Sequence, residues 1–262
     1  MSDDPWTRLA RLTPARIGLG RAGAALPTRE VLRFALDHAR ARDAVHTPLD
    51  AEALEAALVA LGHGVLHVES AAPDRPTYLR RPDLGRRLSA ASRAGLEGRQ
   101  RPPTDLAVVV ADGLSAAAVQ THAAPLLAAL APWIARANWT LAPVVIARQG
   151  RVALGDEVGA LLRARMVVML LGERPGLSSP DSLGIYLTFG PRPGRSDAER
   201  NCISNVRPAG LSYELAAFKL AWHLTEALRL GLTGLTLKDQ SDLARLEAHV
   251  SDPRLPPKNL KT

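Results

Sequence analysis

Apolar residues in the middle of the chain form short runs that are separated by longer helical patterns. Three continuous runs rich in Val, Ile and Leu, which are typical of strands buried on both faces, are Leu106–Ala111, Pro143–Ala147 and Met166–Leu171. Between them the pattern predicts helices over Ser115–Ala129 and Leu154–Ala164. Strands and helices that alternate in this way predict right-handed crossovers and a mostly parallel sheet.

The C-terminal part continues with a further apolar run, Leu183–Phe189, that ends at a glycine. A long apolar helix is predicted over Leu211–Leu230, with Ser212 as its cap and a glycine directly after it. We expect an edge strand over Leu235–Asp239. The proline-rich tail from Ser251 is expected to be frayed.

The N-terminal part has little strand character. Residues 1–27 read as an extended arm that lies on another surface, and Thr28–Val45 is predicted to be a helix capped by Thr28. A second helix is expected from a capping Thr47 to about Leu61, because proline and an acid follow that threonine. Val65–Glu69 reads as a short strand with a packed His67.

These elements predict an α/β fold with two parts. The segment Arg99–Thr104 carries two consecutive prolines and reads as a linker. We therefore expect an N-terminal arm and helical region over residues 1–104. Residues 105–262 are expected to form a Rossmann-like, mostly parallel sheet with helices on both faces.

Composition narrows the class of protein. The 262 residues carry a formal charge of +7, but 29 of the 33 basic residues are dispersed arginines and aromatic residues make up only 4%. Few aromatic platforms for bases argue against nucleic-acid binding. No apolar stretch reaches the ~20 residues of a membrane span. The single cysteine, Cys202, excludes an intrachain disulfide and metal sites built from cysteine clusters. We expect a cytoplasmic protein that binds neither nucleic acid nor membrane.

The sequence nominates no catalytic residue and no metal ligand. Asp112 and Ser115 follow a buried strand and precede a helix, where an anion could bind, but the serine is equally explained as a helix cap. A serine nucleophile needs an adjacent base, and no motif supplies one. The patterns of zinc proteases and of serine hydrolases with a nucleophile elbow are absent.

The stretch from Val167 to Val206 is the best candidate for a binding site. A buried run ends at Gly172, and the charged pair Glu173–Arg174 follows; further along, the segment 197–205, read as a loop, contains the lone cysteine. Ligands of open α/β sheets bind beyond the carboxyl ends of the strands. The residues alone therefore predict a ligand-facing edge here.

Several long motifs occur in one order along the chain. They are T-P-A-R-I-G-L-G-R-A-G (13–23), L-D-H-A-R-A-R-D-A-V-H (36–46), A-D-G-L-S-A (111–116), G-E-R-P-G-L-S-S-P-D-S-L-G-I-Y (172–186) and R-N-C-I-S-N (200–205). In the sequences and the order of these motifs, the chain closely resembles the small subunit of ethanolamine ammonia-lyase, an adenosylcobalamin-dependent enzyme. The resemblance extends from Thr13 to about Asp239.

The resemblance implies a lyase that is active only as a hetero-oligomer. The small subunit is expected to hold the lower, nucleotide side of adenosylcobalamin. The ethanolamine ammonia-lyase large subunit, a (β/α)₈ barrel, is expected to bind ethanolamine and to carry its radical deamination to acetaldehyde and ammonia. Residues 105–262 would then be the cobalamin-binding domain. The location implied is the cytoplasm, with a bacterial microcompartment as the alternative.

The resemblance also implies three cofactor-binding residues, Val152, Glu173 and Cys202. The Glu173 carboxylate would accept hydrogen bonds from corrin amides. Cys202 would pack against the cofactor, and cobalt would take no ligand from this chain, which lacks the D-x-H-x-x-G motif of other cobalamin modules. Glu173 could instead form a surface ion pair with Arg174, and Cys202 could be a small buried hydrophobe. At the level of the whole chain, the alternatives are an autonomous α/β enzyme and a purely structural partner subunit.

Overall fold

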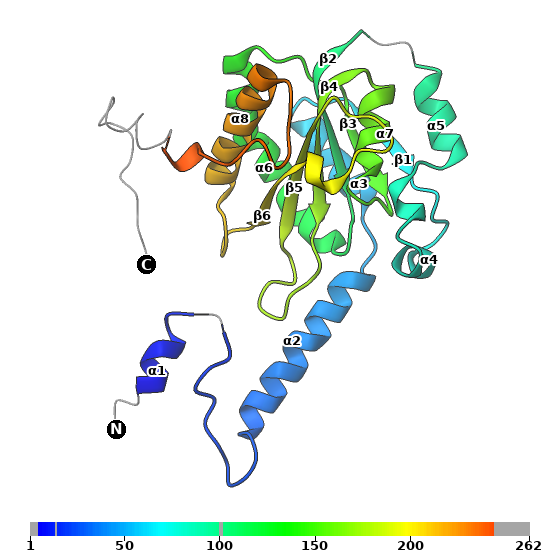
Figure 1. Cartoon of the computed structure of the whole chain (residues 1–262). Helices are drawn as coiled ribbons and strands as arrows, with labels where there is room; N and C mark the ends of the chain where they lie inside the picture. Colours follow the sequence, from blue (N-terminus) through cyan, green and yellow to red (C-terminus); the bar gives the residue numbers. More distant parts are fainter. Residues whose placement is uncertain (1–4, 14, 100–101, 244–262) are drawn as a thin grey trace.

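A computed structural model describes residues 5–13, 15–99 and 102–243, and within these ranges one six-stranded sheet organises the chain (Figure 1). Its strand order is β1-β3-β2-β4-β5-β6. The first four strands in this order are parallel, whereas β5 and β6 are each antiparallel to their neighbour. The strands are β1 (Val65–Glu69), β2 (Thr104–Ala111), β3 (Val144–Arg148), β4 (Ala164–Gly172), β5 (Leu183–Phe189) and β6 (Asn201–Val206).

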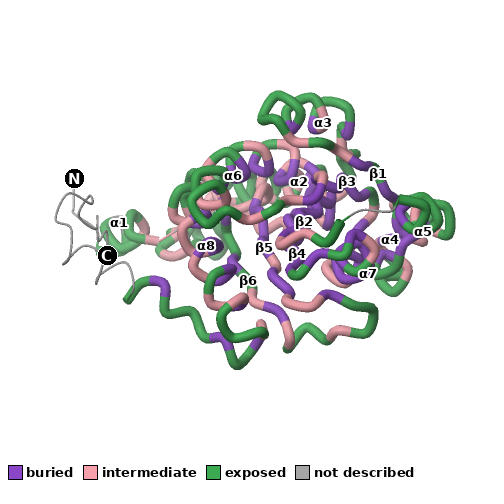
Figure 2. The backbone as a smooth tube through the Cα atoms, turned by 90° about the horizontal axis from the view of Figure 1, so that it is seen from above, coloured by how far each residue is buried: buried purple, intermediate pink, exposed green. Residues whose placement is uncertain are grey.

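Helices cover both faces of this sheet. Helices α3, α6 and α8 contribute to the core on one face, and α5 and α7 to the core on the other (Figures 1 and 2). The helices are α1 (Pro5–Ala10), α2 (Thr28–His46), α3 (Ala51–Ala60), α4 (Arg75–Arg80), α5 (Ala90–Glu97), α6 (Ala116–Ala137), α7 (Leu154–Leu161) and α8 (Tyr213–Leu230). The predicted α/β class is confirmed, and the sheet is mixed because of its antiparallel end. No helix in the described ranges is long and apolar enough to cross a bilayer.

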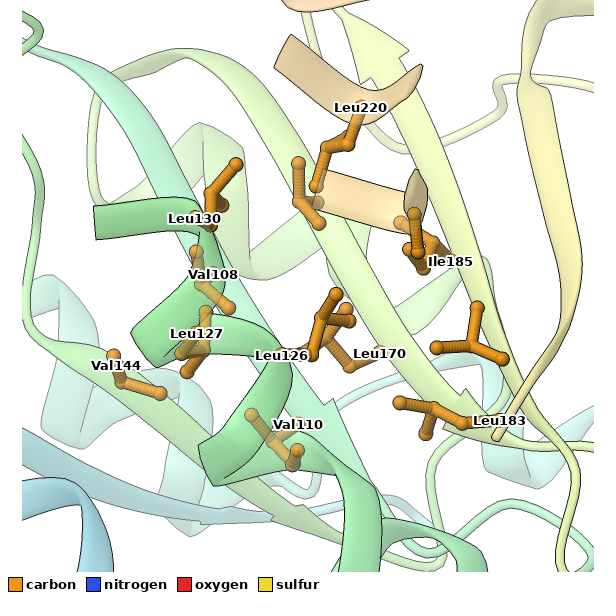
Figure 3. Close-up of a cluster of buried hydrophobic side chains, with 14 of the residues drawn as sticks. Val108, Val110, Leu126, Leu127, Leu130, Val144, Leu170, Leu183, Ile185 and Leu220 are labelled. Carbon is orange, nitrogen blue, oxygen red and sulfur yellow. The ribbon is translucent and has the colours of Figure 1, made fainter. Parts of the chain in front are cut away.

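The strand β2 lies at the centre of the core. Its side chains alternate between the two faces, so that Val108 and Val110 belong to the cluster under α6 while Val109 belongs to the cluster under α7. Figure 3 shows the first cluster, in which leucines of α6 pack against valines of the strands. Because both faces are covered, β2 needs apolar residues at every position, which explains its continuous apolar run.

The two faces are covered differently at the antiparallel end. On one face, α8 packs against β5 and β6. On the other face, α7 packs against β2 and β4. The strand β6 accordingly alternates between buried Ile203, which belongs to the α8 core, and exposed Cys202 and Ser204. One face of β6 is therefore open.

Two predicted strands and one predicted helix cap match closely, whereas the starts of two helices are corrected. The bounds of β1 and β5 are as predicted, and Ser212 caps α8 by accepting a hydrogen bond from the Leu215 amide at 3.3 Å. Thr28 is the first residue of α2 and does not cap it, because Pro27 holds the cap position. The cap of α3 is Asp50 and not Thr47, since the Asp50 carboxylate accepts from the Ala53 amide at 3.0 Å.

Other predictions are corrected by tertiary structure. His67 is exposed and pairs with Glu55 at 2.8 Å, so it is not packed in the core. The predicted loop at 197–205 contains β6, because its backbone pairs with β5. Residues 235–239 form turns and no strand, and the N-terminal arm contains the short helix α1. The tail predicted to fray from Ser251 lies outside the described residues.

The sheet draws on residues from both sides of position 104. Strand β1 pairs with β3 along its length, from Val65 opposite Val144 to Glu69 opposite Arg148. The helix α2, by contrast, extends away from the sheet (Figure 1) and buries only Ala44 among its residues. Leu32 and Phe34 of α2 are 64% and 48% exposed. Like the N-terminal arm and α1, which bury no residue in the described ranges, this helix gains little from the core.

The buried ion pair between Arg200 and Asp156 supplies a stability prediction. The two side chains are 3% and 1% exposed, and the guanidinium donates to both carboxylate oxygens at 2.6 and 2.7 Å. Arg200→Met leaves a buried carboxylate unpaired, and we expect a loss of about 3–5 kcal/mol in the free energy of unfolding. Urea unfolding of the purified chain measures this loss.

The matched control is Arg229→Met. Arg229 pairs with Glu226 at 2.6 Å, but its side chain is 64% exposed. The loss expected for this surface pair is at most about 1 kcal/mol. Equal unfolding midpoints for the two variants would contradict a structural role for the buried pair.

Candidate functional site

One hollow of about 620 Å³ lies where the carboxyl ends of β2, β3 and β4 lead out of the sheet. Its walls come from the β3–α7 loop, from the segment after β4 and from the open face of β5 and β6. Val152, Glu173 and Cys202 all line it. The structure thus brings together three residues that are far apart in the sequence, and their roles toward a cofactor remain proposals.

A close approach of two backbones positions the start of the β4–β5 connection. The Leu114 amide donates to the Gly172 carbonyl at 2.9 Å. A Cβ atom on Gly172 would lie 2.0 Å from the Ser115 carbonyl oxygen, so no larger residue fits without backbone movement. Because Gly172 ends β4, Glu173 emerges at the rim of the hollow.

The Glu173 carboxylate is held by the antiparallel strands. Its Oε2 accepts hydrogen bonds from the Ser182 hydroxyl and from the Asn205 amide, the latter at 3.3 Å. In the described part of the chain Glu173 forms no ion pair with Arg174, so that alternative is not seen. Both contacts fall on Oε2, which leaves Oε1 able to accept from a ligand.

Cys202 faces the hollow from β6, directly opposite Tyr186 of β5 in the strand pairing. Its thiol contacts the Ser204 hydroxyl at 3.3 Å. Cys202 is exposed to the hollow, but protein surrounds the rest of its side chain. The resulting desolvation raises the pKa of the Cys202 thiol. The thiol is therefore neutral at pH 7, and its exposure excludes the predicted alternative of a small buried hydrophobe.

Val152 lies in a turn that two buried groups fix in place. The Gly150 amide donates to the Asp112 carboxylate at 3.2 Å, and the Tyr78 hydroxyl donates to the Gly150 carbonyl at 2.9 Å. The Arg151 amide donates to Gly85 at 2.8 Å. These bonds present Val152 to the hollow at the start of α7, a helix that no side chain caps.

Asp112 and Ser115 serve the framework. Asp112 is buried, and this burial raises the pKa of its carboxyl group, whereas Arg75 at 3.5 Å lowers it. Ser115 caps α6 by accepting from the Ala118 amide at 3.3 Å and donates to the Pro180 carbonyl at 2.9 Å. Neither partner of Ser115 is a base, so the hydroxyl is not an activated nucleophile.

Sequence reasoning missed two kinds of lining residue. Tyr186 reaches the hollow only because β5 is antiparallel to β4, and its burial, with the nearby Cys202 and Glu173, raises the pKa of its hydroxyl. Arginines 86, 151, 174 and 200 also line the hollow. Arg174 and Arg200 belong to two of the motifs quoted above but were assigned no role, whereas Arg86 and Arg151 lie in none of those motifs. Within the described ranges no three His, Cys, Asp or Glu side chains gather closely enough to bind a metal ion.

A second hollow, of about 480 Å³, lies between the N-terminal arm, α2 and the β4–β5 connection. It contains none of the residues predicted to bind a ligand. Its cations include Arg16, which pairs with Asp37 at 2.7 Å. The hollow at the strand ends is therefore the better candidate site.

Comparisons with known proteins show the family to which the chain belongs. The family model for "Ethanolamine ammonia-lyase light chain (EutC)" matches residues 3–238. Relatives named "Ethanolamine ammonia-lyase small subunit" occur in Azotobacter vinelandii, 56% identical over 96% of this chain and 94% of the relative, and in Bradyrhizobium diazoefficiens, 57% identical over 90% and 91%. The relative in Pseudomonas aeruginosa is 54% identical over 94% and 91%. The chain therefore belongs to the ethanolamine ammonia-lyase light chain family.

Proposed function

We propose that this chain is the small subunit of an adenosylcobalamin-dependent ethanolamine ammonia-lyase and that its hollow holds the lower, nucleotide side of the cofactor. The observation that carries the proposal is the convergence of Val152, Glu173 and Cys202 on one hollow. These three residues come from the β3–α7 loop, the end of β4 and strand β6. Ligands of open α/β sheets bind at such strand ends, where the following helices lie on opposite faces.

The lining residues fit part of this cofactor. A hollow of about 620 Å³ is the size of an ordinary small-molecule site. A corrin with its nucleotide loop is larger than that, so this chain would hold one side and leave the other to a partner. Glu173 offers a free carboxylate oxygen to amide donors, and Tyr186 and Val152 offer apolar surface.

Each residue of the site has a distinct task in this proposal. Glu173 accepts hydrogen bonds from amide groups at the corrin rim. Cys202 packs as a small neutral group, and no residue of this chain ligates cobalt. Adenosylcobalamin, when bound, supplies the radical chemistry of the reaction. This chain orients the cofactor and shields its lower side from water.

The ethanolamine site belongs to the large subunit in this proposal. Leu32 and Leu36 lie one turn apart on α2 and are 64% and 50% exposed. Neighbouring exposed leucines on one helix face support a protein partner. We infer a hetero-oligomer that works in the cytoplasm, either free or enclosed in a bacterial microcompartment. The autonomous α/β enzyme has no support, since Asp112 and Ser115 form no acid–base pair. The purely structural subunit is separated from our proposal by the variants described below.

The proposed dependence of activity on the large subunit gives the first functional prediction. The isolated chain, supplied with adenosylcobalamin and ethanolamine, should produce no acetaldehyde, because no group lining its hollow is placed for deamination. Co-expression with an ethanolamine ammonia-lyase large subunit should yield a complex that does. Coupled reduction of acetaldehyde measures both. Turnover by the chain alone would refute the proposed division of roles.

Glu173→Gln tests the polar contact. The substitution removes the charge of the acceptor while the side-chain size is kept. A hydrogen bond to a charged group is worth about 1.5–3 kcal/mol, so the affinity of the complex for adenosylcobalamin should fall about tenfold or more. Absorbance titration measures this. The control is Glu55→Gln, which alters an exposed pair with His67 outside the hollow and should leave the affinity unchanged.

Cys202→Trp tests the packing contact. A large ring at this exposed position fills the hollow without entering the core, so the chain should fold and the cofactor should bind at least about tenfold more weakly. Cys202→Ala keeps the space and should change the affinity little. The same titration applies, with circular dichroism as the folding control. Unchanged affinity in Cys202→Trp and Glu173→Gln would favour the purely structural subunit.

A further inference from the structure

The four arginines that line the hollow differ in how their charges are balanced. Arg200 donates to the buried Asp156 at 2.6 and 2.7 Å. Arg86 lies 3.9 Å from Asp197. Arg151 and Arg174 form no ion pair with any acid in the described part of the chain. Two guanidinium groups without a counter-charge therefore face one hollow.

Arg151 is the more informative of the two. Its guanidinium carbon lies 4.4 Å from the centre of the Tyr78 ring, which holds the group in place from one side. Its Nε is buried and has no hydrogen-bond partner. A buried donor without an acceptor is costly and uncommon in folded proteins. Such a donor beside a hollow indicates an acceptor that arrives with a ligand.

The acids near the hollow do not neutralise these two cations. Glu173 lines the same hollow, but its single negative charge is set against the two charges of Arg151 and Arg174. Asp197 lies beside Arg86 and Arg200. Asp112, behind the turn that carries Arg151, has Arg75 as its cation at 3.5 Å. The remaining charge of the hollow is therefore positive, and it favours an anionic group.

We propose that Arg151 and Arg174 bind the phosphodiester of the cofactor's nucleotide loop. This inference rests on the proposed function and extends it to two residues of the same site. The phosphodiester is the one permanently anionic group of adenosylcobalamin. Guanidinium groups match phosphate oxygens with paired donors.

The test isolates the phosphate by comparing two truncated cofactors. Adenosylcobinamide lacks the nucleotide loop, and adenosylcobinamide phosphate carries a phosphate on the same side arm. Absorbance titration of the complex with the large subunit gives both affinities. The unsubstituted complex should bind the phosphorylated form about tenfold or more tightly. In Arg151→Gln and Arg174→Gln this preference should shrink severalfold, while adenosylcobinamide should bind as before.

Two further variants control for structure. Arg151→Lys keeps a cation and should recover part of the preference, which a merely structural role would not predict. Arg136→Gln alters an arginine beside Trp133, outside the hollow, and should leave both affinities unchanged. Because Arg151 also contacts Tyr78, Arg174→Gln provides a variant without a described side-chain contact to lose.

The outcomes separate this inference from the proposed function. A complex that binds none of adenosylcobalamin, adenosylcobinamide and its phosphate would contradict the proposed function itself. A complex that binds all three, with a phosphate preference unchanged in both glutamine variants, would overturn the inference alone. Equal weakening of both truncated cofactors in both variants would also overturn it, because the arginines would then act on the corrin or on folding.

Discussion

The antiparallel pairing of β4 with β5 is the constraint on which the candidate site depends. A parallel return would need a crossover, usually a helix, and the ten residues from Glu173 to Ser182 contain none. The chain therefore turns back beside β4, and β6 turns back again. The two added strands extend the sheet past the region that α7 covers, and α8 covers them on the opposite face. The open face of β5 and β6 becomes one wall of the hollow.

The arginines around the hollow fall into two groups, those paired with an acid and those without one. Arg200 and Asp156 are buried together, and the pair ties the segment before β6 to α7. Such a pair is weak evidence for net stability, but it fixes one geometry because any other arrangement would leave a buried charge unpaired. Arg151 and Arg174, by contrast, lie on the hollow without acids in the described chain. The buried pair fixes the position of β6 relative to α7, and the two unpaired arginines leave positive charge available for a ligand.

Local signals predicted what depends on local physics. The bounds of β1 and β5 and the caps Ser115 and Ser212 follow from apolar runs and from hydroxyl groups before helices. Strand β6 was missed because its exposed face carries Cys202 and Ser204, so half of its apolar signal is absent. Of the site, Glu173, Cys202 and Val152 came from the family resemblance. Tyr186 ends one of the quoted motifs, but its place in the hollow depends on the strand register, and Arg151 lies in no quoted motif and reaches the hollow through the fold.

The chemistry of the lining residues favours binding over catalysis. Proton transfer near neutral pH needs a group whose pKa lies close to the working pH. Burial raises the pKa values of Cys202 and Tyr186 above their ordinary ranges, so both groups stay protonated at pH 7. The arginines stay charged at any physiological pH, and no histidine lines the hollow in the described chain. What the hollow offers is fixed charge, one free carboxylate oxygen and apolar surface. These groups can orient a ligand, and in the proposed complex the making and breaking of bonds falls to the cofactor and to the large subunit.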